Sequence, residues 1–142
     1  MAEVRAVAAR EAAVRAAALR EAVGKAAAAG AAALKAVPEV NASWMGDKIR
    51  RYKKADVRVA VQTEAGLMVP VVRNACGLGL TGISSEVRSL AGKAKEGKLT
   101  PTDMIGGTFT ISNLGMPQFG VTQFNAIVNP PNAAIVAALA ST

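Results

Sequence analysis

The chain has 142 residues, which is enough for one domain with a core but short for two domains of ordinary size. It contains one cysteine and no histidine, which excludes an internal disulfide and a multi-cysteine metal site and removes the commonest general base near neutral pH. The net charge of +7 keeps nucleic acids and other polyanions open as partners, and the aromatic fraction of 4% leaves the core to aliphatic side chains.

Alanine, arginine and glutamate dominate residues 1–36, and all three are strong helix formers. We therefore predict a helix with a weak apolar face, which Gly24 and Gly30 weaken or divide. The arginines fit an organelle-targeting peptide, but the glutamates among them do not, so we expect the helix to be retained. Pro38 should end it, because the residue before a proline is pushed out of the helical region.

Five cations surround Tyr52 between residues 48 and 54. A basic patch with one aromatic ring could bind nucleic acid, although nucleic-acid platforms usually interleave several rings with the charges. We interpret the segment as a solvated strand or hairpin edge, where lysines deter pairing with other edges. The sequence also lacks a run of the roughly 18 uninterrupted apolar residues that a membrane helix needs, so no membrane span is predicted.

Residues 57–62 alternate valines with other side chains, a pattern typical of a half-buried strand. A turn at 63–66 and an apolar run at 67–72 complete a predicted hairpin. Pro70 confines the second strand to an edge, a strand start or a bulge, because proline cannot donate a ladder hydrogen bond. Cys76 follows and is interpreted as a small loop residue.

Apolar residues recur at helical spacing from Ile83 to Ala94, which predicts an amphipathic helix starting near Thr81 or Ser84. Lysines occupy its last turns, as the helix dipole favours, and Gly97 is the predicted cap.

Residues 106–131 read GGTFTISNLGMPQFGVTQFNAIVNPP. Hydroxyl side chains alternate there with Phe109 and Ile111, which predicts a half-buried strand ending at Ser112. A Ser-Asn-Leu-Gly turn follows, and Gly115 would allow a close approach of backbone or ligand. On its own the stretch is typical of a polar strand edge with an ordinary turn. Residues 133–140 are apolar and predict a buried strand or a final short helix.

Four segments, LKAVPEVNASWM, VAVQTEAGLMVPVVRNA, LAGKAKEGKLTPTDMIGGTFTISNLGM and FNAIVNPPNAAIVA, occur in that order over residues 34–138. Together they closely resemble the first half of the catalytic domain of mitochondrial-type dihydrolipoamide acyltransferases, the core subunits of 2-oxoacid dehydrogenase complexes. The resemblance implies an α/β fold, a two-layer sandwich of helices on a mixed sheet like chloramphenicol acetyltransferase, here incomplete. It divides the chain into an Ala/Arg-rich helical extension, 1–33, and a truncated acyltransferase-like domain, 34–142.

The resemblance also implies roles for individual residues. In the family, the serine of TISNLG, here Ser112, donates a hydrogen bond to the oxyanion that forms when a dihydrolipoyl thiol attacks an acyl-coenzyme A thioester. Asn113 and Gly115 are carried over as residues that bind coenzyme A or lipoamide, and no metal is implied. Where the family commonly has NLGMFG, this chain has NLGMPQFG, so the turn beside the serine differs.

The family's general base is a histidine in an Asp-His-Arg motif, and this sequence has neither the motif nor any histidine. Asp103 and Glu96 are expected in a polar loop, and Lys98 shows no sign of the burial that would lower its pKa, so none of them replaces the base convincingly.

Three functions follow as hypotheses. The first is a non-catalytic structural or binding subunit of a larger assembly, an oligomer or hetero-oligomer with full-length dihydrolipoamide acyltransferase as one candidate partner. The second is an acyltransferase subunit that contributes Ser112 to an active site shared with a full-length partner. The third is a basic nucleic-acid-binding protein, whose binding should weaken steeply with salt. By resemblance, we expect a soluble protein of the mitochondrial matrix.

Overall fold

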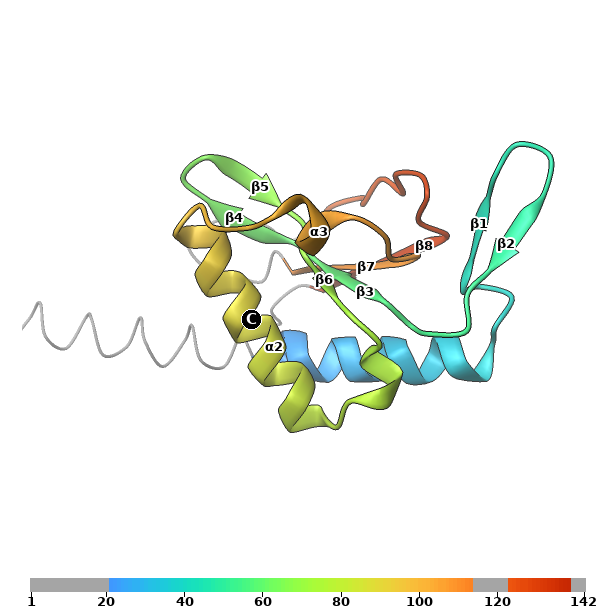
Figure 1. Cartoon of the computed structure of the whole chain (residues 1–142), viewed down its shortest axis with the longest axis horizontal. Coiled ribbons are helices and arrows are strands. Elements are labelled where there is room, and N and C mark those ends of the chain that lie inside the picture. The colour runs from blue at the N-terminus through green and yellow to red at the C-terminus, as the bar shows by residue number, and fades with distance from the viewer. Residues whose placement is uncertain (1–20, 114–122, 139–142) are drawn as a thin grey trace, which may run out of the picture.

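The computed structural model describes residues 21–113 and 123–138 (Figure 1). A helix over residues 21–36 comes first, and short strands and two further helices follow it. In chain order the other elements are β1 Ala42–Trp44, β2 Ile49–Arg51, β3 Val57–Val59, β4 Val61–Thr63, β5 Gly66–Met68, β6 Val71–Val72, the 3-10 turn η1 Ala75–Gly77, α2 Leu80–Lys95, α3 Pro101–Met104, β7 Phe109–Asn113 and β8 Ala134–Ala138.

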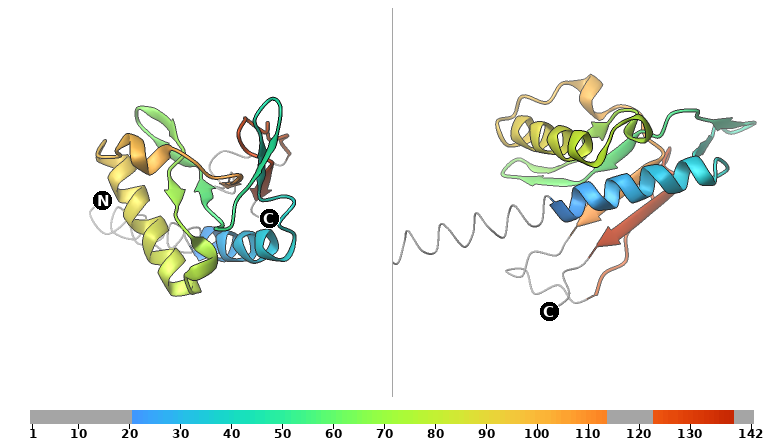
Figure 2. Two further views of the ribbon diagram at one scale, coloured as in Figure 1. Left: turned by 45° about the vertical axis from the view of Figure 1, so that its right-hand side comes forward. Right: turned by 90° about the horizontal axis from the view of Figure 1, so that it is seen from below.

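The main sheet has the strand order β6-β3-β7-β8. β6 is antiparallel to β3, whereas β7 runs parallel to both β3 and β8, so the sheet is mixed as predicted. Helix 21–36 and α2 lie on the same side of this sheet (Figure 2). One continuous core joins the two layers through the buried residues Ala27, Ala31, Leu34, Val57, Val59, Val72, Ile83, Val87, Leu90, Phe109 and Ile111. The predicted α/β sandwich is thereby confirmed.

Helix 21–36 is continuous, so the prediction that Gly24 and Gly30 divide it is wrong. Both glycines face close neighbours instead. A Cβ on Gly24 would lie 2.5 Å from Ser84 Oγ, and one on Gly30 would lie 2.6 Å from Phe109 Cε1. The missing side chains therefore bring the helix close to α2 and to β7, and this packing outweighs the low helix propensity of glycine.

The helix ends at residue 36, two residues before Pro38, as predicted. It runs across the predicted boundary between residues 33 and 34, and Ala27, Ala31 and Leu34 all join the same core. Residues 21–33 therefore pack as part of the folded unit. The predicted helix over residues 1–20 lies outside the described residues.

α2 matches its prediction closely. Its buried residues are the four predicted apolar positions, Ile83, Val87, Leu90 and Ala94. Gly97 follows the helix with a φ of +67°, and its N–H bonds to the Ala94 carbonyl at 3.2 Å. The N–H of Lys98 bonds to the Lys93 carbonyl at 2.8 Å, which completes a Schellman motif. The predicted glycine cap is confirmed.

The predicted hairpin over residues 57–72 is present, but each strand is interrupted. β3 pairs with β6 in the main sheet, and β4 pairs with β5 in a separate two-stranded sheet. Ala60 N–H bonds to the Ile111 carbonyl of β7 at 3.0 Å, as expected next to a central strand, and the break coincides with Pro70, which has no N–H to donate. β6, next to Pro70, lies at an edge of the four-stranded sheet, as Pro70 predicted.

Two predictions about burial are wrong. The strand β7 exists, but it is not half-buried, because Thr108 and Thr110 are 3% and 6% exposed and as enclosed as their apolar neighbours. A strand also forms at β8, but none of its residues is buried, and Val136 is 43% exposed. β7 is central and covered on both faces, whereas β8 is the outermost described strand on its side of the sheet.

Candidate functional site at the carboxyl end of β7

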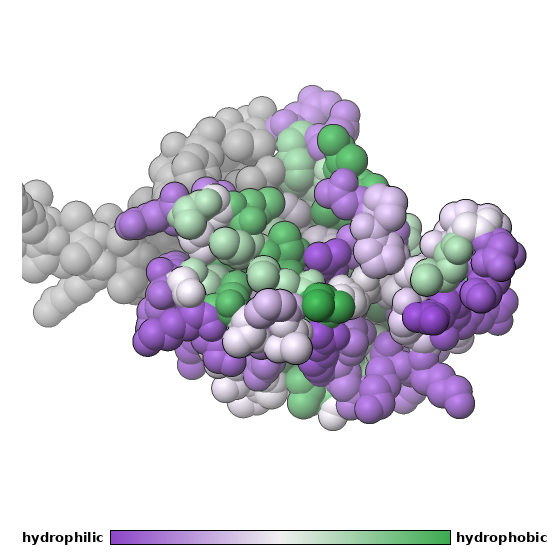
Figure 3. All heavy atoms as spheres, turned by 45° about the horizontal axis from the view of Figure 1, so that its top comes forward, coloured by the Kyte–Doolittle hydropathy of each residue, from purple (hydrophilic) through white to green (hydrophobic). Residues whose placement is uncertain are grey.

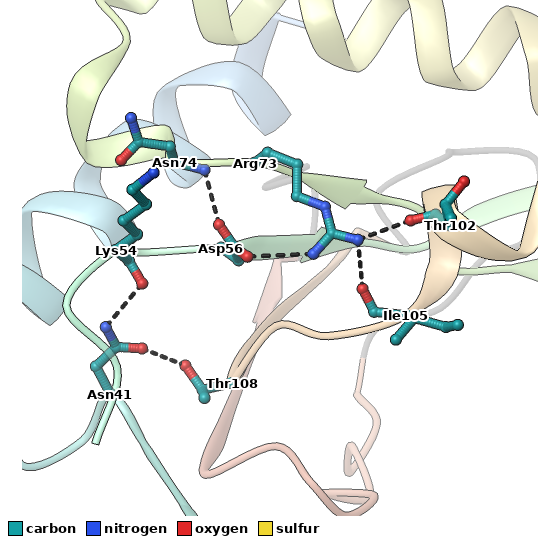
Figure 4. Close-up of polar contacts among 8 residues, drawn as sticks. All are labelled: Asn41, Lys54, Asp56, Arg73, Asn74, Thr102, Ile105 and Thr108. Atoms are coloured by element: carbon teal, nitrogen blue, oxygen red, sulfur yellow. Dashed lines mark hydrogen bonds and ion pairs between the residues drawn. The ribbon is translucent and has the colours of Figure 1, made fainter. Parts of the chain in front are cut away.

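Asn41 holds the segment that leads into β7. Its side chain is 3% exposed and donates from Nδ2 to the carbonyls of Tyr52, at 2.9 Å, and Lys54, at 3.1 Å. Its Oδ1 accepts a hydrogen bond from Thr108 Oγ1 at 2.5 Å (Figure 4). One buried amide therefore joins the chain after helix 21–36, the segment before β3 and the residue before β7.

Arg73 ties the loop between α3 and β7 to the sheet (Figure 4). Its Nη2 donates to the carbonyls of Thr102, at 2.7 Å, and Ile105, at 2.5 Å. Its Nη1 lies 3.2 Å from Asp56 Oδ2, and the other oxygen of Asp56 accepts the N–H of Asn74 at 2.7 Å. Since Asp56 precedes β3, this network fixes the loop beside the amino end of β7.

Gly106 and Gly107 allow the chain to pass close to two arginine side chains where it enters β7. Their φ values are +94° and +81°, which favour glycine, and added Cβ atoms would lie 2.9 Å from Arg73 Nη1 and 2.6 Å from Arg58 Cγ. The chain can enter β7 beneath both arginine side chains only because these two positions lack a side chain.

The Asn-Pro-Pro-Asn segment before β8 covers the hydroxyl-bearing face of β7. Asn132 Oδ1 accepts a hydrogen bond from Thr110 Oγ1 at 3.2 Å, and the Ala133 N–H donates to the Thr108 carbonyl at 2.7 Å. Ser43 Oγ donates to the Pro131 carbonyl at 2.7 Å, so β1 is attached as well. The Pro130–Pro131 peptide bond is cis. Thr108 and Thr110, on the hydroxyl-bearing face of the predicted strand, are thus engaged in structural contacts.

Ser112 and Asn113 stand at the carboxyl end of the same strand, opposite Ala137 and Ala138 of β8. Both are half-buried. Within residues 21–113 and 123–138, the side chain of Ser112 makes no hydrogen bond. Ser112 and Asn113, which are adjacent in sequence, therefore both lie at the end of β7, and Gly115 lies outside the described residues.

The acidic candidates for a general base are engaged elsewhere. Asp103 belongs to α3, where its carboxylate accepts hydrogen bonds from the Thr100 N–H at 2.9 Å and the Thr100 hydroxyl at 2.8 Å. These bonds lower the pKa of Asp103. Glu96 pairs with Lys98 at 2.8 Å on the surface. Because Arg73 ties α3 to the amino end of β7, Asp103 lies away from Ser112.

Lys48, Arg50 and Arg51 lie in the exposed hairpin of β1 and β2, which projects from the body of the protein, and the rest of the basic segment follows it at exposed positions (Figure 1). The interpretation as a solvated hairpin is confirmed. Hydrophilic residues gather at this end of the molecule, on the right in Figure 3, although Trp44 is 68% exposed and Ile49 is 65% exposed. Nucleic-acid binding by this segment stays a prediction.

A pocket of about 390 Å³ opens between the end of helix 21–36, the segment after β2 and η1. It does not include Ser112, and its lining residues are Leu34, Lys35, Pro38, Asn41, Arg51, Tyr52, Lys53, Ala55 and Cys76. The sequence singled out the cations near Tyr52 but not Lys35, because only the fold brings the helix to them. Cys76 lies in η1, with Sγ 3.5 Å from Asn74 Oδ1.

Two further features concern the described part of the chain. No group of three or more metal-ligating side chains stands close enough there to hold a metal ion. None of the helices there is both long and apolar enough to cross a membrane.

Comparison with known proteins gives one consistent result. Residues 2–142 match the family "2-oxoacid dehydrogenases acyltransferase (catalytic domain)". Component 3 of the mitochondrial pyruvate dehydrogenase complex of Arabidopsis thaliana, a dihydrolipoyllysine-residue acetyltransferase, is 59% identical over 107 residues. That match covers 75% of this chain but only 20% of the relative, so the chain spans about a fifth of the length of the curated relative.

Two solved structures share the fold. Dihydrolipoamide acetyltransferase of Azotobacter vinelandii, studied for the role of a serine, a histidine and an asparagine in its catalytic mechanism, has a TM-score of 0.77 and 38% identity. The match covers 84% of this chain and 49% of that one. The cubic core of a pyruvate dehydrogenase multienzyme complex has a TM-score of 0.72 and 37% identity, over 88% of this chain and 56% of that one.

Proposed function

This chain belongs to the 2-oxoacid dehydrogenase acyltransferase family, and on that premise we propose that its 142 residues serve as a structural or binding member of a larger protein assembly and do not transfer acyl groups by themselves. The observation that carries this proposal is the set of exposed apolar side chains on β8 and on the segment before it, within the residues that the structure describes. Val136, Ile127 and Val128 are 43%, 79% and 44% exposed there. Apolar surface gathered beside a strand edge is typical of a site that another protein covers.

The chemistry supports the second half of the proposal. Transfer to dihydrolipoamide requires a thiolate, because the thiol itself is a poor nucleophile. The 142 residues contain no histidine, and Asp103 and Glu96 are held in contacts of their own. A base for the thiol would therefore come from outside these 142 residues.

The position of Ser112 favours a second candidate function, in which the chain contributes this hydroxyl to an active site shared with a full-length acyltransferase. The dihydrolipoyl sulfur would bond to the thioester carbon, and the Ser112 hydroxyl would donate to the resulting oxyanion. Collapse of that intermediate would break the bond to the coenzyme A sulfur, which leaves as a thiolate and takes a proton. One such donor is typically worth about 3 kcal/mol of transition-state stabilisation.

The relatives give this proposal its setting. The Arabidopsis relative is a component of a mitochondrial complex, and one solved relative forms a cubic core. We place this chain, by the same reasoning, in a pyruvate dehydrogenase-like assembly of the mitochondrial matrix. Coenzyme A thioesters and lipoamide would be the substrates handled by that assembly.

The assembly proposal is tested by measuring the mass of the purified chain, alone and mixed with an intact acyltransferase, by light scattering. We expect a stable oligomer or a mixed complex, and we expect Val136→Lys to reduce it because a charge would be buried at the contact. Ser89→Lys adds the same charge on an exposed position of α2 and should change nothing. A chain that stays monomeric and binds no acyltransferase would contradict the proposal.

The shared-site candidate needs a different assay. Transfer from acetyl-coenzyme A to dihydrolipoamide is measured with the intact acyltransferase alone, with added wild-type chain, and with Ser112→Ala or Ser89→Ala. We expect the wild-type chain and Ser89→Ala to raise the rate per intact subunit and Ser112→Ala to fail. Equal rates with Ser112→Ala and wild type would exclude this candidate and leave the assembly proposal standing.

A further inference from the structure

We propose that the pocket at the end of helix 21–36 binds a small phosphate ester that carries an apolar or aromatic body. This site is separate from Ser112, and the inference does not depend on the proposed acyltransferase assembly. At about 390 Å³, the pocket falls within the range of small-molecule sites. Its walls come from three parts of the chain, namely the helix, the segment after β2 and η1.

The charges around the pocket have one sign. Lys35, Arg51 and Lys53 line it, and no carboxylate does. Among the residues that the structure describes, Lys35 and Lys53 take part in no ion pair. Arg51 is 3.9 Å from Glu39, and both side chains are largely exposed, so this pair is weak and leaves the guanidinium available. Three cations around one opening suit a doubly charged anion, and guanidinium groups bind phosphate in a bidentate manner.

The wall that carries these cations is held in place before any ligand arrives. Tyr52 is bonded to Asn41 through both its N–H and its carbonyl, each at 2.9 Å, and the Lys54 carbonyl accepts from the same side chain. On the other side, the Ala75 N–H donates to the Ala55 carbonyl at 2.7 Å. A preformed wall reduces the entropy lost on binding, so the segment is suited to hold a ligand as well as to be solvated.

The interior of the pocket explains why the ligand needs more than a phosphate. Leu34 and Ala55 are buried, and with Pro38 they form an apolar surface beneath the cations. Tyr52 lines the same space, and its aromatic ring is of a kind that can stack on an aromatic ligand. Inorganic phosphate would engage the cations but leave this surface wet, whereas an aromatic phosphate ester would engage both.

Cys76 provides the measurement, because it is the only cysteine of the chain and lines the pocket. The rate of its alkylation by iodoacetamide, an uncharged reagent, is followed by mass spectrometry. We expect phenyl phosphate to slow the reaction saturably, and phenol, inorganic phosphate and glucose 6-phosphate to do so less at equal concentration. Calorimetric titration with phenyl phosphate should give a dissociation constant that matches the protection curve.

The variants separate a built site from general attraction to a basic protein. The double variant Arg51→Ala/Lys53→Ala removes two cations from the pocket, and Lys48→Ala/Arg50→Ala removes two from the same basic segment outside the pocket. We expect the first to raise the dissociation constant of phenyl phosphate by at least about tenfold, and the second by much less. Equal losses in both variants, or no saturable binding to the wild-type chain in either measurement, would overturn the proposal.

Discussion

The two ends of β7 are built differently. At the amino end, Thr108 and Thr110 are buried and hydrogen-bonded to Asn41 and Asn132, side chains far away along the chain. At the carboxyl end, Ser112 and Asn113 are half-buried beside the outermost described strand. One strand therefore combines an end fixed by buried polar contacts with an end whose side chains are half-buried. Polar contacts at its amino end set its position, and the hydroxyl of Ser112 stands at the other end.

The largest expected effect comes from removing the amide that holds the amino end. Asn41→Ala would leave the Thr108 hydroxyl and two carbonyls without their partner in a buried place, so we expect a loss of about 3 kcal/mol in the free energy of unfolding. Urea denaturation measures it, and Asn129→Ala, at an exposed turn position, should cost less than about 0.5 kcal/mol. Similar losses of unfolding free energy in both variants would show that Asn41 contributes no more to stability than an exposed residue does.

The next effect tests how closely helix 21–36 lies on β7. Gly30→Ala places a Cβ 2.6 Å from the Phe109 ring, so we expect a destabilisation of about 2 kcal/mol. Gly92→Ala, in α2, has no neighbour within 4 Å and should instead stabilise by about 0.5–1 kcal/mol, because alanine favours the helix. We therefore expect the two variants to shift the melting temperature in opposite directions. A stabilising Gly30→Ala would show that the helix is held less closely than described.

Replacing Arg73 should lower the free energy of unfolding by a moderate amount. Arg73→Ala removes its bonds to two carbonyls and to Asp56, but the side chain is 48% exposed, so we expect a cost of only about 1 kcal/mol. Arg73→Lys keeps the charge but not the fork of donors, and should recover less than half of the loss. Full recovery with lysine would mean that charge alone accounts for the contact.

At the carboxyl end the expected effect on stability is small. Ser112→Ala removes a half-buried hydroxyl that has no hydrogen bond within the described chain, so the free energy of unfolding should change by less than about 0.5 kcal/mol. Urea denaturation of this variant beside Asn41→Ala compares the two ends directly. A loss as large as that of Asn41→Ala would assign Ser112 to the structural framework.

The smallest effect is a pH dependence at α3. The pKa of Asp103 is lowered by the hydrogen bonds from Thr100, so its ionised form stabilises the folded state above the ordinary pKa of an aspartate. That contribution is lost as the pH falls through the lowered pKa. The difference in melting temperature between wild type and Asp103→Ala should therefore be present near pH 7 and absent near pH 2. Glu86→Ala, an exposed acid of α2, controls for charge, and a difference that persists in acid would contradict the assignment.

The sequence predicted those elements whose signal is local. The spacing from Ile83 to Ala94 identified α2 and its buried face, and Gly97 identified its end. It did not predict the burial of Thr108 and Thr110, because the side chains that cover them come from Asn41 and Asn132. Gly30 was misjudged for the same reason, since its neighbour Phe109 is distant in sequence.

The site residues likewise divide into those with a local sequence signal and those that only the fold brings together. Ser112 and Asn113 followed from the resemblance of one short motif to a family, and both lie at the end of β7. The basic pocket could be predicted only in part. Arg51 and Lys53 stand out as charges near Tyr52, but Lys35 reaches the pocket from a helix whose position depends on the packing of the whole core.

The most direct test of the account is the rate of acyl transfer from acetyl-coenzyme A to dihydrolipoamide catalysed by the purified chain alone, measured beside Ser112→Ala. The account predicts that both proteins give the rate of the uncatalysed reaction, since the chain contains no histidine and the two acidic candidates, Asp103 and Glu96, are engaged elsewhere. Transfer above that rate by the wild-type chain, abolished in Ser112→Ala, would show that these 142 residues form a complete active site and would contradict it.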